Sequence, residues 1–197
     1  MRAGRFIVHG RHDRLSIPPN KLGVEIEAAL AFGTGHHGTT RGCLLLLDHV
    51  LKAWSPRRVL DVGTGTGVLA IAAAKALRIK VLASDIDPLS VRVARENARL
   101  NGTANWGRTI QASGFSAPQF AAHGPFDLVL ANILANPLRQ MATEMAAHLA
   151  PSGLVILSGL LPPQAQSVIA AYRRRGLVLE RHLQIEGWSS LLMRNAG

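Results

Sequence analysis

The sequence predicts an α/β fold in which helices cover both faces of a mostly parallel sheet, with one antiparallel strand added near the C-terminus. Three observations support this prediction. Strand-like and helix-like segments alternate from about residue 39 onward, and residues 126–133 form the near-continuous apolar run of a buried parallel strand. Two strand-like runs then flank Glu186-Gly187, which indicates a hairpin.

The first half of the alternation is bounded by residues that break or cap helices. One helix should end before Ser55-Pro56, and Asp87 can cap another that begins with a proline and ends at Asn101-Gly102. The expected elements are a helix over 39–53, a strand over 57–62, an alanine-rich helix over 68–77, a strand over 80–86, the capped helix and a weaker strand over 109–112.

The second half follows the same pattern. Asn136 is interpreted as the N-cap of a helix, and Gly176 as the end of the last helix. The core stripe expected of the first of these helices consists of Leu138, Met141, Met145 and Leu149. The other expected elements are a turn over 151–153, a strand over 154–160, the last helix over 162–176, and hairpin strands over 177–185 and 188–194.

Length and composition indicate one globular domain. The chain has 197 residues, 48% of them apolar, and we expect a strand and linker segment over 1–32 ahead of the α/β domain over 33–197. No run approaches the roughly 18 apolar residues of a membrane span, and no signal peptide is recognised. The single cysteine, Cys43, excludes an internal disulfide, fits the reducing cytoplasm and lies in an apolar helix pattern, as a core residue would.

The formal net charge is +10, and most of the positive charge is arginine. A basic protein is attracted to nucleic acid, so contact with RNA or the ribosome is one interpretation. The other is that arginine occupies solvated faces. Arg92, Arg95 and Arg99 recur at helical spacing, and Arg173-Arg174-Arg175 would complement the dipole at a helix C-terminus.

The most informative motif is a glycine turn between a strand and a helix, VLDVGTGTG over 59–67, followed one helix later by SDID over 84–87. A strand, a glycine turn, a helix and a second strand that ends in a carboxylate build an adenosine-binding crevice. Gly63 lets the backbone approach the ligand, and Asp85 can accept hydrogen bonds from two ribose hydroxyls.

The spacing of the turn favours S-adenosylmethionine over a dinucleotide. Gly63, Gly65 and Gly67 give GxGxG, whereas the dinucleotide fingerprint would need a glycine at Val68. Asp61, just before the turn, disfavours a pyrophosphate but can order the turn and hold positive charge. The terminal hairpin is unusual for a nicotinamide-binding fold, so a dehydrogenase is the least favoured interpretation.

Two further segments indicate the chemistry. Asn132 ends a central strand, where ligands of open α/β sheets bind, and its amide can hydrogen-bond an acceptor amine beside the methyl group. Residues 30–40 indicate a loop that closes over a ligand, with Thr40 able to bond the amino-acid end of the cofactor. Methyl transfer depends mainly on alignment, so no dedicated general base is required.

Metal and serine-nucleophile chemistry are not supported. His36-His37 has no partner cluster with zinc-like spacing, and no Gly-x-Ser-x-Gly elbow occurs. We therefore expect no metal.

Four segments together resemble the PrmA family, the bacterial methyltransferases of large-subunit ribosomal protein eleven: AFGTGHHGTT (31–40), VLDVGTGTGVLAIAAAK (59–75), SDIDPLSVRVARENARLNG (84–102) and ANILANPL (131–138). The resemblance implies a Rossmann-like class I methyltransferase with a seven-stranded sheet. It also implies S-adenosylmethionine as cofactor, and lysine and N-terminal amines of a ribosomal protein as acceptors. By motif position, the family's cofactor contacts fall on Thr40, Gly63, Asp85 and Asn132.

The chain also differs from the family pattern. The family carries a substrate-recognition domain and a linker ahead of this region, and the chain begins near the linker, so we expect a fragment or a stand-alone relative. Residues 111–114 lack the acidic residue that often meets the adenine amino group, which leaves the adenine contacts unassigned. The alternatives are methylation of RNA or of a small molecule, and a non-catalytic module that binds S-adenosylmethionine or the ribosome.

Overall fold

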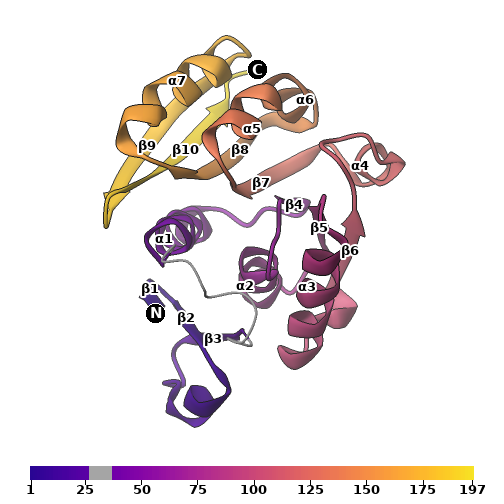
Figure 1. Ribbon diagram of the computed structural model, residues 1–197, viewed down its shortest axis with the longest axis vertical. Coiled ribbons are helices and arrows are strands. Elements are labelled where there is room, and N and C mark those ends of the chain that lie inside the picture. Colours follow the sequence, from indigo (N-terminus) through magenta and orange to yellow (C-terminus); the bar gives the residue numbers. More distant parts are fainter. Residues whose placement is uncertain (27–36) are drawn as a thin grey trace.

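The computed structural model describes residues 1–26 and 37–197, and its main feature is one large sheet between two layers of helices (Figure 1). The strands of this sheet are β4 (Val59–Val62), β5 (Val81–Asp85), β6 (Gly107–Gln111), β7 (Phe126–Asn132), β8 (Leu149–Leu160), β9 (Leu177–Ile185) and β10 (Trp188–Asn195). The helices are α1 (His37–Ala53), α2 (Val68–Leu77), α3 (Pro88–Leu100), α4 (Pro118–His123), α5 (Ala135–Gln140), α6 (Ala142–Ala147) and α7 (Pro162–Arg173).

The seven strands lie in the order β6-β5-β4-β7-β8-β10-β9. The sheet is parallel except for β10, which pairs antiparallel with β8 on one side and with β9 on the other. In Figure 1, α1, α2 and α3 lie on one side of this sheet and α5, α6 and α7 on the other. The predicted fold class is therefore confirmed, including the antiparallel C-terminal strand.

Each face of the sheet has its own hydrophobic core, because alternate side chains of a strand point to opposite faces. On β7, Val129 and Ala131 join the cluster under α4 to α7, and Leu128 and Leu130 join the cluster under α1 and α2. Burial on both faces explains the continuous apolar run of this strand. Cys43 lies in the second cluster, and burial raises the pKa of its thiol to about 12, as expected of a core residue.

The N-terminal residues form a second, three-stranded sheet of β1 (Arg2–Ala3), β2 (Phe6–His9) and β3 (Leu22–Glu25), with the short 3-10 helix η1 (Arg11–Ser16) between the last two. Phe6 and Val24 are fully buried in the same cluster as residues of α1 and α2. This small sheet thus packs onto the helical layer of the large one. The boundary predicted between 32 and 33 lies outside the described residues.

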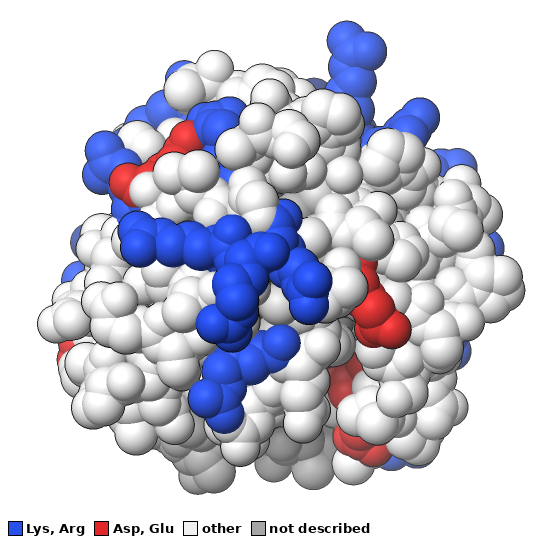
Figure 2. Space-filling model, turned by 90° about the horizontal axis from the view of Figure 1, so that it is seen from above, with Lys and Arg blue, Asp and Glu red and all other residues white. Residues whose placement is uncertain are grey.

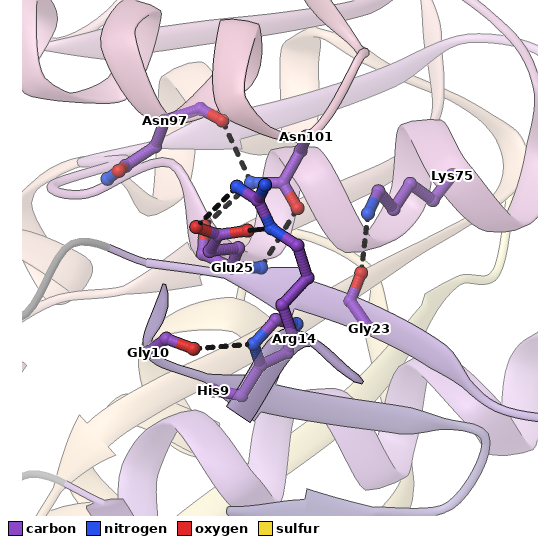
Figure 3. Close-up of polar contacts among 8 residues, drawn as sticks. All are labelled: His9, Gly10, Arg14, Gly23, Glu25, Lys75, Asn97 and Asn101. Carbon is purple, nitrogen blue, oxygen red and sulfur yellow. Dashed lines mark hydrogen bonds and ion pairs between the residues drawn. The ribbon is translucent and has the colours of Figure 1, made fainter. Parts of the chain in front are cut away.

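A polar network also ties the small sheet to the helices (Figure 3). The guanidinium of Arg14 donates two hydrogen bonds, of 2.7 and 2.8 Å, to the buried carboxylate of Glu25, and this holds the Glu25 pKa below its usual range. Asn101, at the end of α3, accepts from the Glu25 backbone N–H at 2.9 Å and donates to the Glu25 carbonyl at 2.6 Å. Lys75 of α2 donates to the carbonyl of Gly23.

Two predictions about the α5 region are wrong. Leu134, and not Asn136, is the N-cap of α5, and the expected single helix breaks into α5 and α6 at Met141. The expected stripe also ends early, because Leu149 begins β8: the Phe126 N–H donates to the His148 carbonyl, and Phe126 pairs with Leu149. Pairing with β7 thus satisfies backbone groups that a longer helix would have used.

Other differences are smaller. Residues 151–153, expected as a turn, lie inside β8, with Ser152 at a φ of 60°. The last helix ends at Arg173 instead of residue 176, and α4 and the 3-10 helix η2 (Ala104–Trp106) were not expected. Among the described residues, none of the helices is long and apolar enough to cross a membrane.

We predict that Asn101→Ala lowers the free energy of unfolding by about 1–3 kcal/mol, because two backbone groups of the buried Glu25 lose their partners. Urea denaturation followed by circular dichroism measures the change. Asn105→Ala is the matched control, since that side chain is exposed on η2. Equal effects of the two substitutions would contradict the anchoring role of Asn101.

Candidate functional site

The glycine turn follows β4 directly and leads into α2. Gly63, Gly65 and Gly67 have φ values of 67°, 55° and 83°, in the left-handed region that residues with a Cβ adopt at a cost. Space is also restricted at the first of them, because a Cβ on Gly63 would come within 2.3 Å of Cγ2 of Ile133. The conformation therefore explains why the motif needs glycine.

The carboxylate of Asp61 stabilises this turn through hydrogen bonds. Asp61 is 1% exposed, and its Oδ2 accepts hydrogen bonds from Oγ1 of Thr64 at 2.6 Å and from the backbone N–H of Ala70 at 3.1 Å. Burial, and to a smaller extent the charge of Asp85, raises the pKa of Asp61 to about 6. Its Oδ1 is buried and has no hydrogen-bond partner among the described residues, so the carboxylate keeps one oxygen for a further donor.

Asp85 ends β5 beside the same turn. One oxygen of its carboxylate accepts from the N–H of Gly65 at 2.8 Å and the other from the N–H of Asp87 at 3.0 Å, and the side chain is partly exposed. Asp87 instead caps α3, because its carboxylate accepts from the N–H groups of Leu89 and Ser90. The prediction that Asp87 is a helix cap is confirmed.

Asn132, at the end of β7, reaches the first turn of α1. Its Nδ2 donates to Oγ1 of Thr39 at 3.3 Å and to Oγ1 of Thr40 at 3.4 Å. The amide oxygen of Asn132 takes no part in these two contacts. Residues from α1 and β7, which are far apart in the sequence, thus present an amide and two hydroxyls at one place.

Two adjoining cavities lie at the carboxyl ends of the parallel strands, where open α/β sheets bind ligands. One, of about 320 Å³, is lined by Thr39, Thr40, Asp61, Gly63, Thr64, Gly65, Thr66, Val68, Leu69, Asn132, Ile133, Leu134, Gly159 and Trp188. The other, of about 490 Å³, is lined by Val62, Gly63, Ser84, Asp85, Ile86, Ala112, Ser113, Gly114, Ile133, Leu134, Pro137, Gln140 and Met141. Because Gly63, Ile133 and Leu134 line both, we treat the cavities as one crevice.

The structure brings six of the seven residues predicted from the sequence to this crevice. They are Thr40, Asp61, Gly63, Gly65, Asp85 and Asn132. Gly67 lines neither cavity. It is the N-cap of α2, and a Cβ there would lie 3.2 Å from Cβ of Ala94, so it permits close packing of the turn against α3. Of the loop expected over residues 30–40, residues 30–36 lie outside the described residues, and residues 37–40 are not a loop but the first turn of α1.

Several residues at the crevice were not found from the sequence. Gly159, at the end of β8, has a φ of 86°, and a Cβ there would lie 2.3 Å from the Ile133 carbonyl. Trp188 is the first residue of β10, in the C-terminal hairpin, and lines the first cavity. Asn97 of α3 is buried and donates to the carbonyl of Thr66 at 2.9 Å, which braces the glycine turn from behind. Of these three residues, only Gly159 could have been found from the sequence, because a glycine at the end of a strand is a local signal.

No group of three or more His, Cys, Asp or Glu side chains that could hold a metal ion occurs in residues 1–26 and 37–197. The crevice is instead a backbone cradle with one buried carboxylate, one partly exposed carboxylate and the amides of Asn132 and Gln140. Such a donor set suits an organic ligand that carries a cationic group and hydroxyls.

Comparison with known sequences gives a consistent result. A family model described as ribosomal protein L11 methyltransferase (PrmA) matches residues 1–196. A ribosomal protein L11 methyltransferase from Rhodopseudomonas palustris (strain BisB5) is 76% identical over 191 residues, which are 97% of this chain and 65% of that protein. Its counterpart from Bradyrhizobium diazoefficiens is 73% identical over 195 residues, or 99% and 66% of the two chains. The chain thus spans just under two thirds of the length of these relatives.

Solved structures agree. The crystal structure of a ribosomal protein L11 methylase from Lactobacillus delbrueckii subsp. bulgaricus superposes with a TM-score of 0.85 at 28% identity, covering 98% of this chain and 96% of that one. TrmN from Thermus thermophilus superposes with a TM-score of 0.61 at 26% identity, over 78% of this chain and 48% of that one. The family model covers nearly the whole chain, and the resemblance inferred from the four motifs is confirmed. This chain belongs to the PrmA family of ribosomal protein L11 methyltransferases.

Proposed function

We propose that this chain performs methyl transfer from S-adenosylmethionine to amines of ribosomal protein L11, at lysine side chains or the N-terminus. One observation carries the cofactor assignment: the buried Asp61, with a free oxygen, lies beneath a glycine cradle in a crevice that also presents Asp85. The names of the relatives support the acceptor. Activity on a ribosomal protein also implies a cytoplasmic location.

The residues of the crevice fit this cofactor. Gly63 and Gly65 leave the backbone of the turn open to a ligand, and Asp61 can balance the positive charge of the amino-acid end, directly or through water. Asp85 can accept from ribose hydroxyls while it holds the Gly65 N–H. Ile86, Ala112 and Met141 give the second cavity apolar walls that suit an adenine ring, for which the sequence had left no contact assigned.

Beyond cofactor binding, methyl transfer depends on aligning the acceptor amine with the methyl group. When bound, the cofactor supplies an electrophilic methyl group on a sulfonium. The amide of Asn132 can orient an acceptor amine, and the Thr39 and Thr40 hydroxyls hold that amide in place. The partly enclosed crevice favours the neutral form of a lysine amine, because burial and a nearby cation both lower its pKa. No side chain needs to act as a general base.

We also propose that residues 33–197 form the methyltransferase domain and that residues 1–32 are a segment docked onto it. The burial of Phe6 and Val24 against α1 and α2 supports the docking. Methylation of RNA or of a small molecule, and a non-catalytic binding role, have no comparable support from the relatives.

The proposal is tested by radiolabelled methyl transfer to purified L11 from cells that lack this modification. We expect transfer by the chain, and a turnover roughly 10–100-fold lower for Asn132→Ala, because the acceptor is no longer aligned. Asn136→Ala is the control, since that asparagine is exposed in α5. Cofactor binding without transfer to L11, or transfer to RNA instead, would refute the proposed substrate.

A second prediction concerns the ribose contact. Asp85→Ala should weaken S-adenosylmethionine binding by about 1–3 kcal/mol, or roughly 5- to 150-fold in Kd, measured by calorimetry. Asp87→Ser, two residues away, keeps a side-chain cap for α3 and should leave Kd unchanged. Equal affinities for wild type and Asp85→Ala would exclude Asp85 as the ribose ligand.

A third prediction follows from the raised pKa of Asp61. A cationic ligand favours the ionised carboxylate, so Kd should rise as the pH falls below about 6, by up to about tenfold per pH unit. Asp61→Asn should bind weakly at pH 7 and show no such dependence, in calorimetry between pH 5 and 8.

Without ligand, the folded state holds the proton of the Asp61 carboxyl more tightly than the unfolded state does. The free energy of unfolding should therefore decrease as the pH rises from about 4 to about 6.

A further inference from the structure

A third cavity lies at the opposite end of the large sheet, at the amino ends of β4, β5 and β6. Its volume is about 510 Å³, larger than either part of the crevice at the carboxyl ends. Basic and polar side chains dominate its rim, and they are Arg57, Arg58, Lys80, Asn105, Arg108 and His123. All six are exposed. This cavity shares no residue with the methyl-transfer crevice.

Strand register explains why these cations meet. Val59 pairs with Val81, and Val81 pairs with Gly107, on three neighbouring parallel strands. Arg58 and Lys80 each precede the first residue of their strand, and Arg108 is the second residue of β6. Neighbouring strands are about 4.8 Å apart, and Arg108 pairs with Leu82, two residues after Lys80, so the backbones that carry these side chains form a staggered row about 10 Å wide.

The charge of this row is not neutralised locally. The four Lys and Arg side chains take part in none of the ion pairs found within residues 1–26 and 37–197, and no acidic side chain lines the cavity. Asp127 is nearby, but one of its oxygens already accepts from the backbone N–H groups of Arg57 and Arg58, at 2.8 and 2.9 Å. The Arg58 guanidinium donates to the Gly124 carbonyl at 3.1 Å, which steadies it at the rim.

We propose that this cavity binds consecutive phosphate groups of RNA. Four cations that line one cavity can each meet a phosphate of the same chain, and three of the four are arginines, whose planar fork can bond two phosphate oxygens at once. A peptide would also need pockets for its side chains, whereas the apolar lining residues Val59, Val81 and Phe126 are buried in the sheet.

A second basic surface provides the comparison. Figure 2 shows Lys and Arg side chains gathered on the face that α5, α6 and α7 form at the top of Figure 1. Exposed arginines on these helices and just after α7 are Arg139, Arg173, Arg174 and Arg175. They are exposed and line none of the three cavities, so they attract polyanions without enclosing a phosphate.

The choice of RNA over other polyanions draws on the proposed ribosomal substrate, whereas the cavity and its charge do not. RNA binding is measured without cofactor or L11. Loss of the proposed methyl transfer and loss of RNA binding are therefore separate outcomes.

The test is fluorescence anisotropy of the full chain with a labelled single-stranded RNA of mixed sequence, over a salt titration. We expect Arg58→Gln with Arg108→Gln to raise Kd roughly tenfold at 0.1 M salt and to reduce the slope of log K against log salt by roughly 1.4, since two phosphate contacts are lost. Arg174→Gln with Arg175→Gln removes the same charge at exposed positions just after α7 and should change Kd much less. Thermal unfolding and S-adenosylmethionine binding that match those of the wild type show that a variant is folded. If the Arg58 and Arg108 double variant does not fold, Lys80→Gln is measured in its place.

Four results would overturn the proposal. Equal losses for the two double variants would mean attraction by overall charge, and a larger loss for the Arg174 and Arg175 variant would move the RNA to the surface just after α7. Competition by polyglutamate as strong as by RNA would indicate an acidic protein. Binding of inorganic phosphate or a mononucleotide as tightly as RNA, with the same sensitivity to substitution, would indicate a site for a free small anion.

Discussion

The buried carboxylate of Asp61 is the interaction on which the site depends. Asp61 enters the core as part of β4, bonds Thr64 in the turn and Ala70 in α2, and so fixes the angle between strand, turn and helix. Burying a carboxylate is costly, and the raised pKa of Asp61 records that cost. The free oxygen of Asp61 shows what the arrangement leaves for a ligand, because a cationic partner would satisfy it and restore the ionised form.

The turn is also held from outside the strand–turn–helix unit. Asn97 bonds the Thr66 carbonyl from α3, and Asn101, one helical turn later, bonds the backbone of Glu25. α3 therefore links the glycine turn to the N-terminal sheet through hydrogen bonds. On the other side of the crevice, Trp188 and Gly159 belong to the C-terminal part of the chain. The crevice is therefore completed by residues of β8 and β10, far in sequence from the glycine turn.

The two ends of the parallel sheet differ in chemistry for a geometric reason. At the carboxyl ends, Asp61, Asp85 and Asn132 present acceptors and an amide to a ligand with cationic and hydroxyl groups. At the amino ends, residues immediately before the strands contribute Arg58 and Lys80 to a basic rim. Parallel strands place like ends together, so charge that looks scattered along the sequence becomes two separate sites of opposite character.

Local signals in the sequence were sufficient to predict the fold class, the glycine turn and six of the residues that line the crevice. Glycines with positive φ, an apolar strand and the Asp87 cap act within a few residues of one another. The point at which α6 ends depends instead on long-range pairing, since Leu149 belongs to β8 and pairs with Phe126. Only the tertiary structure placed Gly67 against Ala94 and brought Asn132 to Thr39 and Thr40. Those contacts join segments distant in sequence, and the packing of helices against the sheet decides them, which no local pattern encodes.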